Sequence, residues 1–323
     1  MSISTSVIES PSIDLMAVGV GDGIEIAVGN TPLLPLRHVT AHLSPRVKVL
    51  AKAEWFNLSG SVKARPALSI IQAALADGSL TPGKHLIDAT SGNMGIAYAT
   101  LGTAKRIPVT LAMSAKSTPE RISILRALGA EILLTDPDKG TDGAIARAQE
   151  LVAEHPERYF YANQFDNPAN WLAHYKTTGP EIYQQTHGEV THFVAGMGTS
   201  GTMMGAGRYL RQVNPAIQLV AVQPDAPANG LIGLKHMASA IKPKIYDPAM
   251  HDRIAEVSTE AAYAMTLRLA REEGLFVGVS AGAAAEAAIQ IASELEEGVV
   301  VIIFPDSGDK YLSEKDLWDL WLT

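Results

Sequence analysis

Residues 54–66 read Glu-Trp-Phe-Asn-Leu-Ser-Gly-Ser-Val-Lys-Ala-Arg-Pro, and they join a predicted strand to a predicted helix. Residues 47–51 carry the alternation of a strand, and the apolar residues of 67–75 recur at helical spacing. Pro66 is tolerated only near a helix start, which places Lys63 at or just before the first turn. The positive end of the helix dipole disfavours a cation there, so Lys63 has a reason for the lowered pKa that an amine nucleophile needs. A solvated surface lysine is the competing interpretation, which this stretch alone leaves open.

The rest of the chain repeats this order of strand and helix. Strands are predicted at 85–89, 108–113, 131–135, 191–195, 217–222 and 299–304. Helices are predicted at 93–103, 119–128, 142–154, 202–213, 260–273 and 282–294, and one further helix is predicted to end at Gln185. This order predicts an α/β fold of right-handed crossovers and parallel sheets. A chain of 323 residues predicts two domains, each a mostly parallel twisted sheet with helices on both faces.

Loop-forming residues over 161–169 predict the boundary between these domains. The N-terminal α/β domain then covers residues 1–166 and carries the lysine, with room for part of the first 50 residues to belong to the other domain. The C-terminal α/β domain covers 167–323. Residues 1–28 show little periodicity, and they predict either a loose arm or a segment that packs on a partner subunit.

The chain has 34 acidic and 26 basic residues, a net charge of −8, and no cysteine. This charge gives no reason to expect a nucleic acid or an anionic membrane as partner, and the lack of cysteine excludes disulfides and thiolate metal sites. His38 and His42 have no third ligand nearby, so no metal site is predicted. The longest apolar run, 299–305, is too short to span a bilayer, and the first 30 residues lack the charged start of a signal peptide. We therefore expect a cytoplasmic protein.

Three further glycine-rich turns, called joints below, connect a predicted strand to a predicted helix. Ligands of parallel sheets bind at such turns, at the carboxyl ends of the strands. The first, at 90–95, reads Thr-Ser-Gly-Asn-Met-Gly. Its hydroxyls, its amide and the free N–H groups of a helix start suit a carboxylate. An ordinary turn rich in N-cap residues would show the same composition.

The second joint, at 196–202, reads Gly-Met-Gly-Thr-Ser-Gly-Thr. Its glycines let the backbone approach an anion, and Thr199, Ser200 and Thr202 add hydroxyl donors. The joint also satisfies G-x-G-x-x-G, with Asp225 after the next strand, so a dinucleotide is a formal alternative. Three hydroxyl residues in the last four positions fit one phosphomonoester better than a bridging pyrophosphate.

The third joint, at 279–283, reads Val-Ser-Ala-Gly-Ala. It predicts either close packing alone or a serine, Ser280, that reaches a ring nitrogen. Together with Lys63, the joints indicate a cofactor with an aldehyde, a ring nitrogen and one phosphate. That cofactor is pyridoxal phosphate, held by a lysine Schiff base.

In this combination the chain resembles the cysteine synthase (O-acetylserine sulfhydrylase) family, in the fold-type II group of pyridoxal phosphate enzymes with a tryptophan synthase β-like fold. The motifs that carry the resemblance occur in the family's order at 29–33, 60–63, 90–93, 167–170, 198–202 and 280–282. The phrases at 63–67 and 191–210 are similar to the cysteine synthase B branch.

The resemblance implies a β-replacement that makes L-cysteine from O-acetyl-L-serine and sulfide through an aminoacrylate. It implies that Lys63 is the catalytic residue and that the chain forms a homodimer. The residues implied to bind the cofactor are Lys63, Asn93, Gly198, Thr199, Ser200, Gly201, Thr202 and Ser280. Those implied to bind the substrate are Thr90, Ser91, Asn93, Met94 and Gln164.

Three departures from the family pattern bear on the substrates. Ala64 replaces an aspartate, so an ion pair at the helix start is expected to be missing. Leu58 replaces a proline. Met94 replaces a threonine and occurs in plant β-cyanoalanine synthases, which keeps cyanide open as the second substrate.

Two related activities of the same class, those of an O-phosphoserine sulfhydrylase and of a cystathionine β-synthase-like enzyme, also stay open. Residues 225–235 hold no arginine to pair a substrate phosphate, which counts against phosphoserine. Outside this class, a Rossmann oxidoreductase that binds NAD and a non-catalytic homologue remain.

Overall fold

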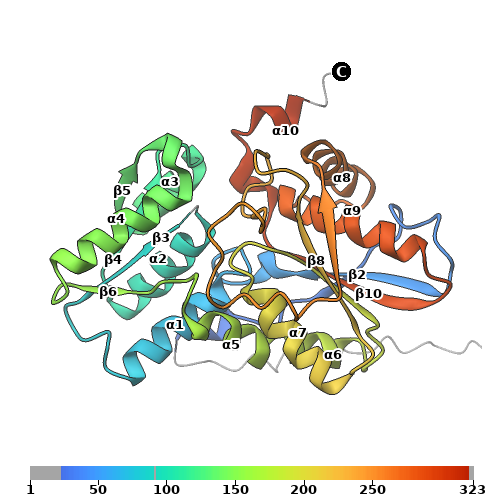
Figure 1. Cartoon of the computed structure of the whole chain (residues 1–323), viewed down its shortest axis with the longest axis horizontal. Coiled ribbons are helices and arrows are strands. Elements are labelled where there is room, and N and C mark those ends of the chain that lie inside the picture. The colour runs from blue at the N-terminus through green and yellow to red at the C-terminus, as the bar shows by residue number, and fades with distance from the viewer. Residues whose placement is uncertain (1–22, 91, 320–323) are drawn as a thin grey trace, which may run out of the picture.

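The structure is a computed structural model, and it describes residues 23–90 and 92–319 (Figure 1). Ser91 and most of the predicted arm at 1–28 therefore lie outside the described residues. The described chain contains two sheets, one of six strands and one of four, with helices around both. No described helix is long and apolar enough to cross a membrane.

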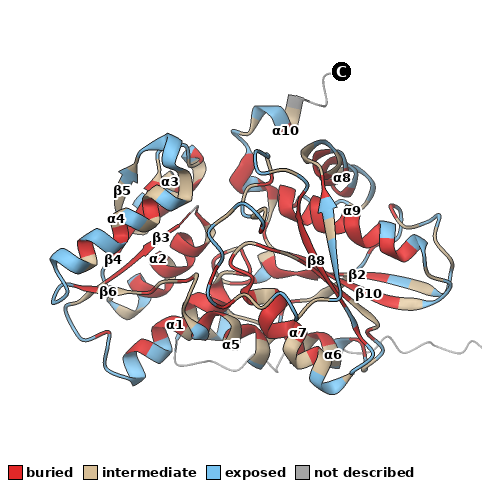
Figure 2. Cartoon of the chain, in the orientation of Figure 1, coloured by how far each residue is buried: buried red, intermediate tan, exposed pale blue. Residues whose placement is uncertain are grey.

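The six-stranded sheet has the order β1-β2-β10-β7-β8-β9. All neighbours pair in parallel except β1, which runs antiparallel to β2. Its strands are β1 Leu33–Pro35, β2 Val47–Ala53, β7 His192–Gly196, β8 Gln218–Pro224, β9 Arg253–Val257 and β10 Gly298–Phe304. The apolar run predicted as a strand is β10, which is buried over nearly its whole length because strands flank it and helices cover both faces (Figure 2).

The four-stranded sheet has the order β5-β4-β3-β6 and is entirely parallel. Its strands are β3 His85–Ala89, β4 Val109–Ser114, β5 Glu131–Thr135 and β6 Tyr159–Tyr161. The predicted bounds of β3 and β5 are confirmed. The expected parallel α/β architecture is therefore present in both halves.

The helices cover the two faces of each sheet. They are α1 Ala64–Ala76, α2 Asn93–Lys105, α3 Pro119–Ala127, α4 Gly140–Glu154, α5 Pro168–Lys176, α6 Thr178–Gln185, α7 Gly201–Val213, α8 Thr259–Glu272, α9 Val279–Ser293 and α10 Lys315–Asp319. Short 3₁₀ turns occur at Ile24–Ala27, Glu54–Phe56, Pro137–Lys139 and Gly308–Tyr311. On the large sheet α9 and α8 share one apolar cluster and α6 and α7 another, and on the small sheet α1, α2 and α3 lie opposite α4.

The structure differs from the prediction at two helices and at strand β9. The helix predicted from residue 282 begins at Val279, so Ser280 lies inside its first turn. The stretch predicted as one helix up to Gln185 divides at Thr177 into α5 and α6. Strand β9 was not predicted, because it is a mostly exposed edge strand with little apolar signal.

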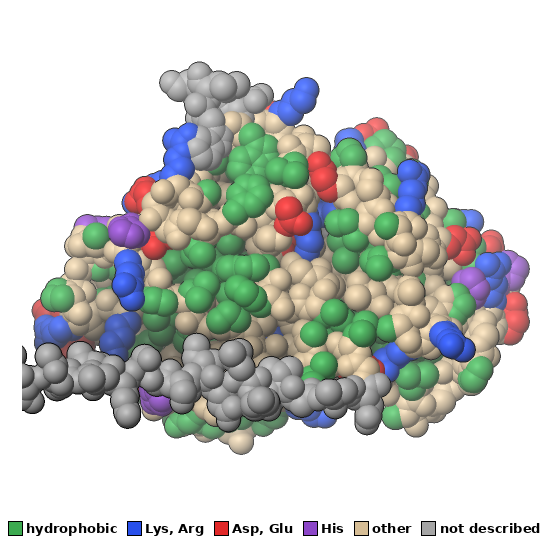
Figure 3. All heavy atoms as spheres, turned by 180° about the vertical axis from the view of Figure 1, so that it is seen from behind, with side chains coloured by type: hydrophobic (Ala, Val, Ile, Leu, Met, Phe, Trp, Pro, Cys, Tyr) green, Lys and Arg blue, Asp and Glu red, His purple; other side chains and the backbone are tan. Residues whose placement is uncertain are grey.

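Strand β2 belongs to the first part of the sequence but pairs with β10, in the sheet built mainly from the second part. The stretch that carries Lys63 therefore starts in one sheet and leads into a helix of the other (Figure 1). The division into domains at residue 166 stays a prediction. The face opposite the view of Figure 1 carries basic and acidic side chains interspersed around its margin (Figure 3).

Candidate active site

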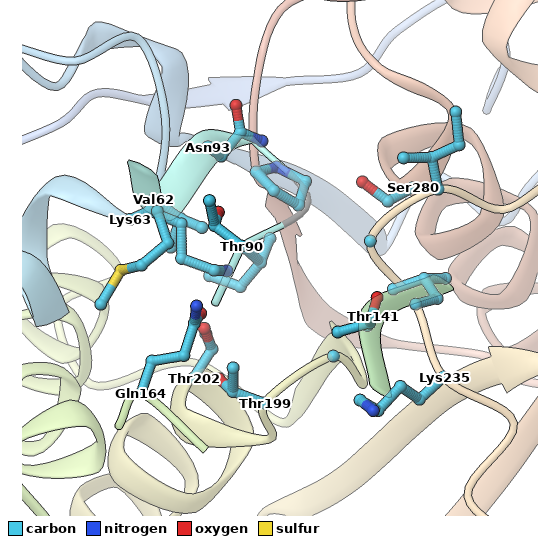
Figure 4. Close-up of a pocket in the computed structure, with 18 of the residues that line it drawn as sticks. Val62, Lys63, Thr90, Asn93, Thr141, Gln164, Thr199, Thr202, Lys235 and Ser280 are labelled. Carbon is cyan, nitrogen blue, oxygen red and sulfur yellow. The ribbon is translucent and has the colours of Figure 1, made fainter. Parts of the chain in front are cut away.

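One pocket lies where the carboxyl ends of strands from both sheets meet. It brings together most of the predicted site residues, from widely separated stretches of the chain (Figure 4). Those that line it are Lys63, Thr90, Asn93, Met94, Gln164, Gly198, Thr199, Thr202 and Ser280. Ser200 and Gly201 belong to the same loop as Thr199 but do not line the pocket.

Lys63 immediately precedes α1, as predicted from Pro66. The turn before it is held by the large sheet, because the Val62 N–H donates to the Pro305 carbonyl at 2.8 Å. Lys310 Nζ also donates to the Gly60 carbonyl at 2.6 Å. These two bonds hold the backbone of the turn from which the Lys63 side chain enters the pocket.

The Lys63 amine has no hydrogen-bonding partner in the described part of the chain, and its surroundings favour loss of its proton. Among residues 23–90 and 92–319, no hydrogen bond or ion pair reaches its Nζ. Burial lowers the pKa of Lys63, and the carboxylates of Asp306 and Glu54 only partly oppose this. The predicted lowering is confirmed in direction, with burial as its main cause. A neutral amine is the form that attacks an aldehyde.

A buried network of charges surrounds the start of α1. Arg65 donates to Glu54 at 2.7 and 2.8 Å and to Glu181 at 2.6 and 2.7 Å. Lys52 adds a bond to Glu181 at 2.7 Å. Ala64 itself makes no ion pair, as expected, but the helix start is not without one, because the next residue, Arg65, supplies two.

Leu58 has a structural consequence. Its N–H donates to the Ala27 carbonyl at 3.0 Å, which ties the lysine loop to the 3₁₀ turn Ile24–Ala27. Proline, the usual residue of the family here, has no N–H to donate. This departure therefore adds a contact outside the pocket rather than changing the pocket.

Thr90 is arranged as a hydrogen-bond donor. Its Oγ1 accepts from the N–H of Gly92 at 2.9 Å and from the N–H of Gly95 at 3.1 Å. A hydroxyl has two acceptor positions and one hydrogen, so the hydrogen is left to point into the pocket. This arrangement suits the predicted carboxylate of a substrate.

Asn93, the first residue of α2, is oriented by Asp306. Its Nδ2 donates to Asp306 Oδ2 at 2.7 Å, and Tyr311 donates to the same oxygen at 2.7 Å. An ionised carboxylate only accepts, so the amide nitrogen must face it. The Asn93 Oδ1 is buried and has no partner among the described residues.

Gln164 is held from three sides. Its N–H donates to Asp88 at 3.2 Å, its Nε2 donates to the Ala89 carbonyl at 2.6 Å, and its own carbonyl accepts from Asn170 at 2.6 Å. The side chain is therefore fixed beside the end of β3, as a substrate-binding residue requires.

Replacing Asp88 by asparagine is expected to remove a pH dependence of stability. Burial raises the pKa of Asp88 to about 7, against three hydrogen bonds that oppose the rise. A folded-state pKa above the unfolded value means that the folded chain binds the proton more tightly, so stability falls as pH rises from about 4 to about 7. In urea unfolding between about pH 5 and about pH 8, the free energy of unfolding of the wild type should fall by about 2 kcal/mol more than that of Asp88→Asn. Parallel pH profiles would contradict this, whatever the constant offset between the two proteins.

The loop after β7 has the close backbone approaches of an anion cradle. A Cβ on Gly198 would lie 2.4 Å from the Gly233 carbonyl oxygen, so only glycine fits. Ser200 has φ 69°, and its buried Oγ has no partner among the described residues. The loop opens α7, whose free N–H groups attract anions. An orphaned hydroxyl at a helix start fits the phosphate of the predicted cofactor.

Ser280 lies across the pocket from Thr199 and Thr202 (Figure 4). No Asp or Glu lines the pocket in the part of the chain that the structure describes. The group available to a ring nitrogen on this side is therefore a hydroxyl. A serine does not keep such a nitrogen protonated as a carboxylate would.

Several lining residues were not predicted. They are chiefly Arg121 of α3, Thr141 of α4, Phe165, Lys235 and Tyr311. Arg121 stacks 4.7 Å over the Tyr311 ring, and Lys235 lies 5.0 Å over the Phe165 ring. Of these residues, Lys235 is the one with a signal in the sequence, because it belongs to a long connection over 223–250, and connections of this length often cover a site.

An α/β fold whose pocket brings a lysine amine together with an anion-binding loop is the arrangement that an enzyme with a phosphorylated aldehyde as cofactor requires. The sequence profile of the pyridoxal-phosphate dependent enzyme family matches residues 24–306, and the chain belongs to this family. Its cofactor is pyridoxal phosphate. The dinucleotide hypothesis finds no support, because Asp225 is exposed and does not line the pocket.

Relatives of known name agree with the predicted resemblance. The chain is 52% identical to a cysteine synthase of Aquifex aeolicus, over 88% of this chain and 89% of the relative. It is 44% identical to cysteine synthase B of Pseudomonas aeruginosa, over 88% and 94%. The crystal structure of a cysteine synthase of Entamoeba histolytica superimposes with a TM-score of 0.89 at 36% identity, covering 98% of this chain and 94% of that one. The predicted resemblance to cysteine synthases is confirmed.

Proposed function

We propose that this protein makes L-cysteine from O-acetyl-L-serine and sulfide. The observation that supports the proposal best is the convergence on one pocket of a free lysine amine, a carboxylate-binding turn and an anion cradle. The cysteine synthases among its relatives, at 52% and 44% identity, support the same reaction.

Each residue takes a role that its contacts support. Lys63 binds the cofactor aldehyde and later holds the proton from the substrate α carbon. The loop at 198–202 holds the phosphate, with Ser280 at the ring nitrogen. When bound, the cofactor supplies an electron sink that lets a leaving group depart from the β carbon.

The substrate carboxylate is proposed to lie in the turn opened by Thr90. Thr90 donates its hydroxyl hydrogen to the carboxylate, and Gln164 lies on the opposite side of the carboxylate. Asn93, from the same turn, lies toward the cofactor. Ser91, although outside the described residues, belongs to the same proposed set.

The identity of the two substrates rests on weaker signals. Met94 is buried in the pocket wall, so it puts a thioether where the usual threonine would put a hydroxyl. Arg121, which comes from α3, and Lys235 give the pocket cationic side chains. The absence of arginine from 225–235 therefore no longer counts against O-phosphoserine.

Parallel spectral titrations test the proposal. The wild-type protein loaded with pyridoxal phosphate is titrated with O-acetylserine, O-phosphoserine, serine and cysteine, and sulfide or cyanide is then added. We expect the visible band to shift with O-acetylserine and to return on addition of sulfide, with cysteine as product. A shift only with O-phosphoserine, or a return only with cyanide, would replace the proposed substrate pair. No response to any donor would indicate a non-catalytic homologue.

The assembly and the location are further proposals. We propose a homodimer in the cytoplasm, on the strength of the family resemblance. Light scattering at two protein concentrations tests the first, and a monomeric mass at both would exclude it.

A further inference from the structure

The motif Asn167-Pro168-Ala169-Asn170 has no role in the proposed function, yet its last residue lies between two of the proposed binding elements. Asn170, in the first turn of α5, is almost fully buried, with 1% of its surface exposed. Its Nδ2 donates to the Gln164 carbonyl at 2.6 Å and to Thr199 Oγ1 at 3.1 Å.

The orientation of the Asn170 amide follows from these partners. The Gln164 carbonyl only accepts hydrogen bonds, so the nitrogen of the amide must face it. The Oδ1 then faces Gly201, where a Cβ would lie only 2.0 Å from it. The absence of a side chain at Gly201 is thus what lets Asn170 reach Thr199.

Thr199 is left with one free hydrogen-bonding position. Its Oγ1 accepts from Asn170 and from the N–H of Gly201 at 3.3 Å, which fills both acceptor positions. Among the described residues it donates to nothing, and it lines the pocket beside Thr202 (Figure 4). Its hydroxyl hydrogen is therefore directed to whatever anion the loop holds.

We propose that Asn170 is a positioning residue that makes Thr199 a hydrogen-bond donor to the cofactor phosphate. The proposal rests on the proposed role of the 198–202 loop. Asn170 touches the phosphate only through Thr199, so its contribution depends on that hydroxyl and on the phosphate.

The experiment measures the dissociation constants of pyridoxal phosphate and of pyridoxal, by absorbance, for the wild type and for Asn170→Ala, Thr199→Ala and the double variant. We expect Asn170→Ala to bind pyridoxal phosphate about 5- to 10-fold more weakly and pyridoxal within about twofold of the wild type. In the Thr199→Ala background, adding Asn170→Ala should change the dissociation constant of pyridoxal phosphate by less than about twofold. Asn170→Asp, which would accept the hydroxyl hydrogen itself, should weaken pyridoxal phosphate binding more than Asn170→Ala.

Asn214→Ala is the matched control. Asn214 follows α7 at its other end and donates to the Val190 carbonyl at 3.0 Å, away from the pocket. It should leave both constants unchanged. Thermal unfolding of each variant without cofactor shows whether it is folded.

Two outcomes overturn the inference on Asn170. One is that Asn170→Ala weakens the binding of pyridoxal as much as that of pyridoxal phosphate. The other is that Asn170→Ala weakens pyridoxal phosphate binding as much in the Thr199→Ala background as in the wild type. A wild-type protein that binds no pyridoxal phosphate would instead overturn the proposed function. If the aspartate variant does not fold, the alanine variant carries the same comparison.

Discussion

Replacing Lys63 by alanine is expected to abolish both the reaction and the covalent attachment of pyridoxal phosphate. Lys235, the other lysine that lines the pocket in the described part of the chain, does not replace it, because its amine lies over the Phe165 ring. The change removes the amine that is proposed both to bond the aldehyde and to hold the α proton. Turnover should fall by at least about 10³-fold.

Borohydride reduction followed by mass spectrometry measures the attachment directly. The wild type should retain the cofactor after reduction and denaturation, and Lys63→Ala should not. Lys48→Ala, which removes an exposed lysine of β2, is the control and should behave as the wild type. A reduced adduct in Lys63→Ala would show that the attachment site had been misplaced.

Replacing Arg65 by methionine is expected to lower the free energy of unfolding by about 3–5 kcal/mol, because it removes the guanidinium that pairs with both Glu54 and Glu181 and leaves Lys52 as the remaining cation of the network. Glu54 is fully buried, and Arg65 and Lys52 hold its pKa below the usual range despite that burial. The same two cations lower the pKa of Glu181 to about 2. In the variant these carboxylates either remain charged without the guanidinium or take up a proton, and both states cost free energy.

Urea unfolding at neutral pH measures this change. Arg253→Met is the control, since the pair of Arg253 and Glu294 is exposed and should leave the urea midpoint unchanged. The destabilisation of Arg65→Met should shrink as pH falls, because protonation discharges the carboxylates that lost their partner. A variant as stable as the wild type at neutral pH would show that the network adds nothing net.

Local signals in the sequence predicted much of the site. Pro66 placed Lys63 at the start of α1, and glycines with hydroxyl residues marked the turns at 90–95 and 196–202. Such signals act over a few residues, through backbone geometry and hydrogen bonds within one turn, so they can be read without knowing the fold. They predicted which residues face a ligand, and the pocket contains most of them.

Other features follow only from tertiary structure. Whether Ala64 leaves the helix start without a salt bridge could not be judged locally, since the second carboxylate on Arg65 comes from Glu181, 116 residues further along the chain. The orientation of Asn93 depends on Asp306, which is 213 residues away, and Arg121 reaches the pocket from α3. No local pattern encodes these contacts, because they exist only once the two sheets have packed.

The sequence by itself therefore determined the α/β class and the cofactor, and it placed the lysine proposed to receive that cofactor at a helix start. Only the tertiary structure decided that β2 pairs with β10, which brings the lysine turn against Pro305 and Lys310. It also decided how each polar side chain is oriented, as Asn170 is by Gln164. The reason is physical: turns and helix starts are set by neighbours in sequence, whereas a hydrogen bond between side chains depends on neighbours in space.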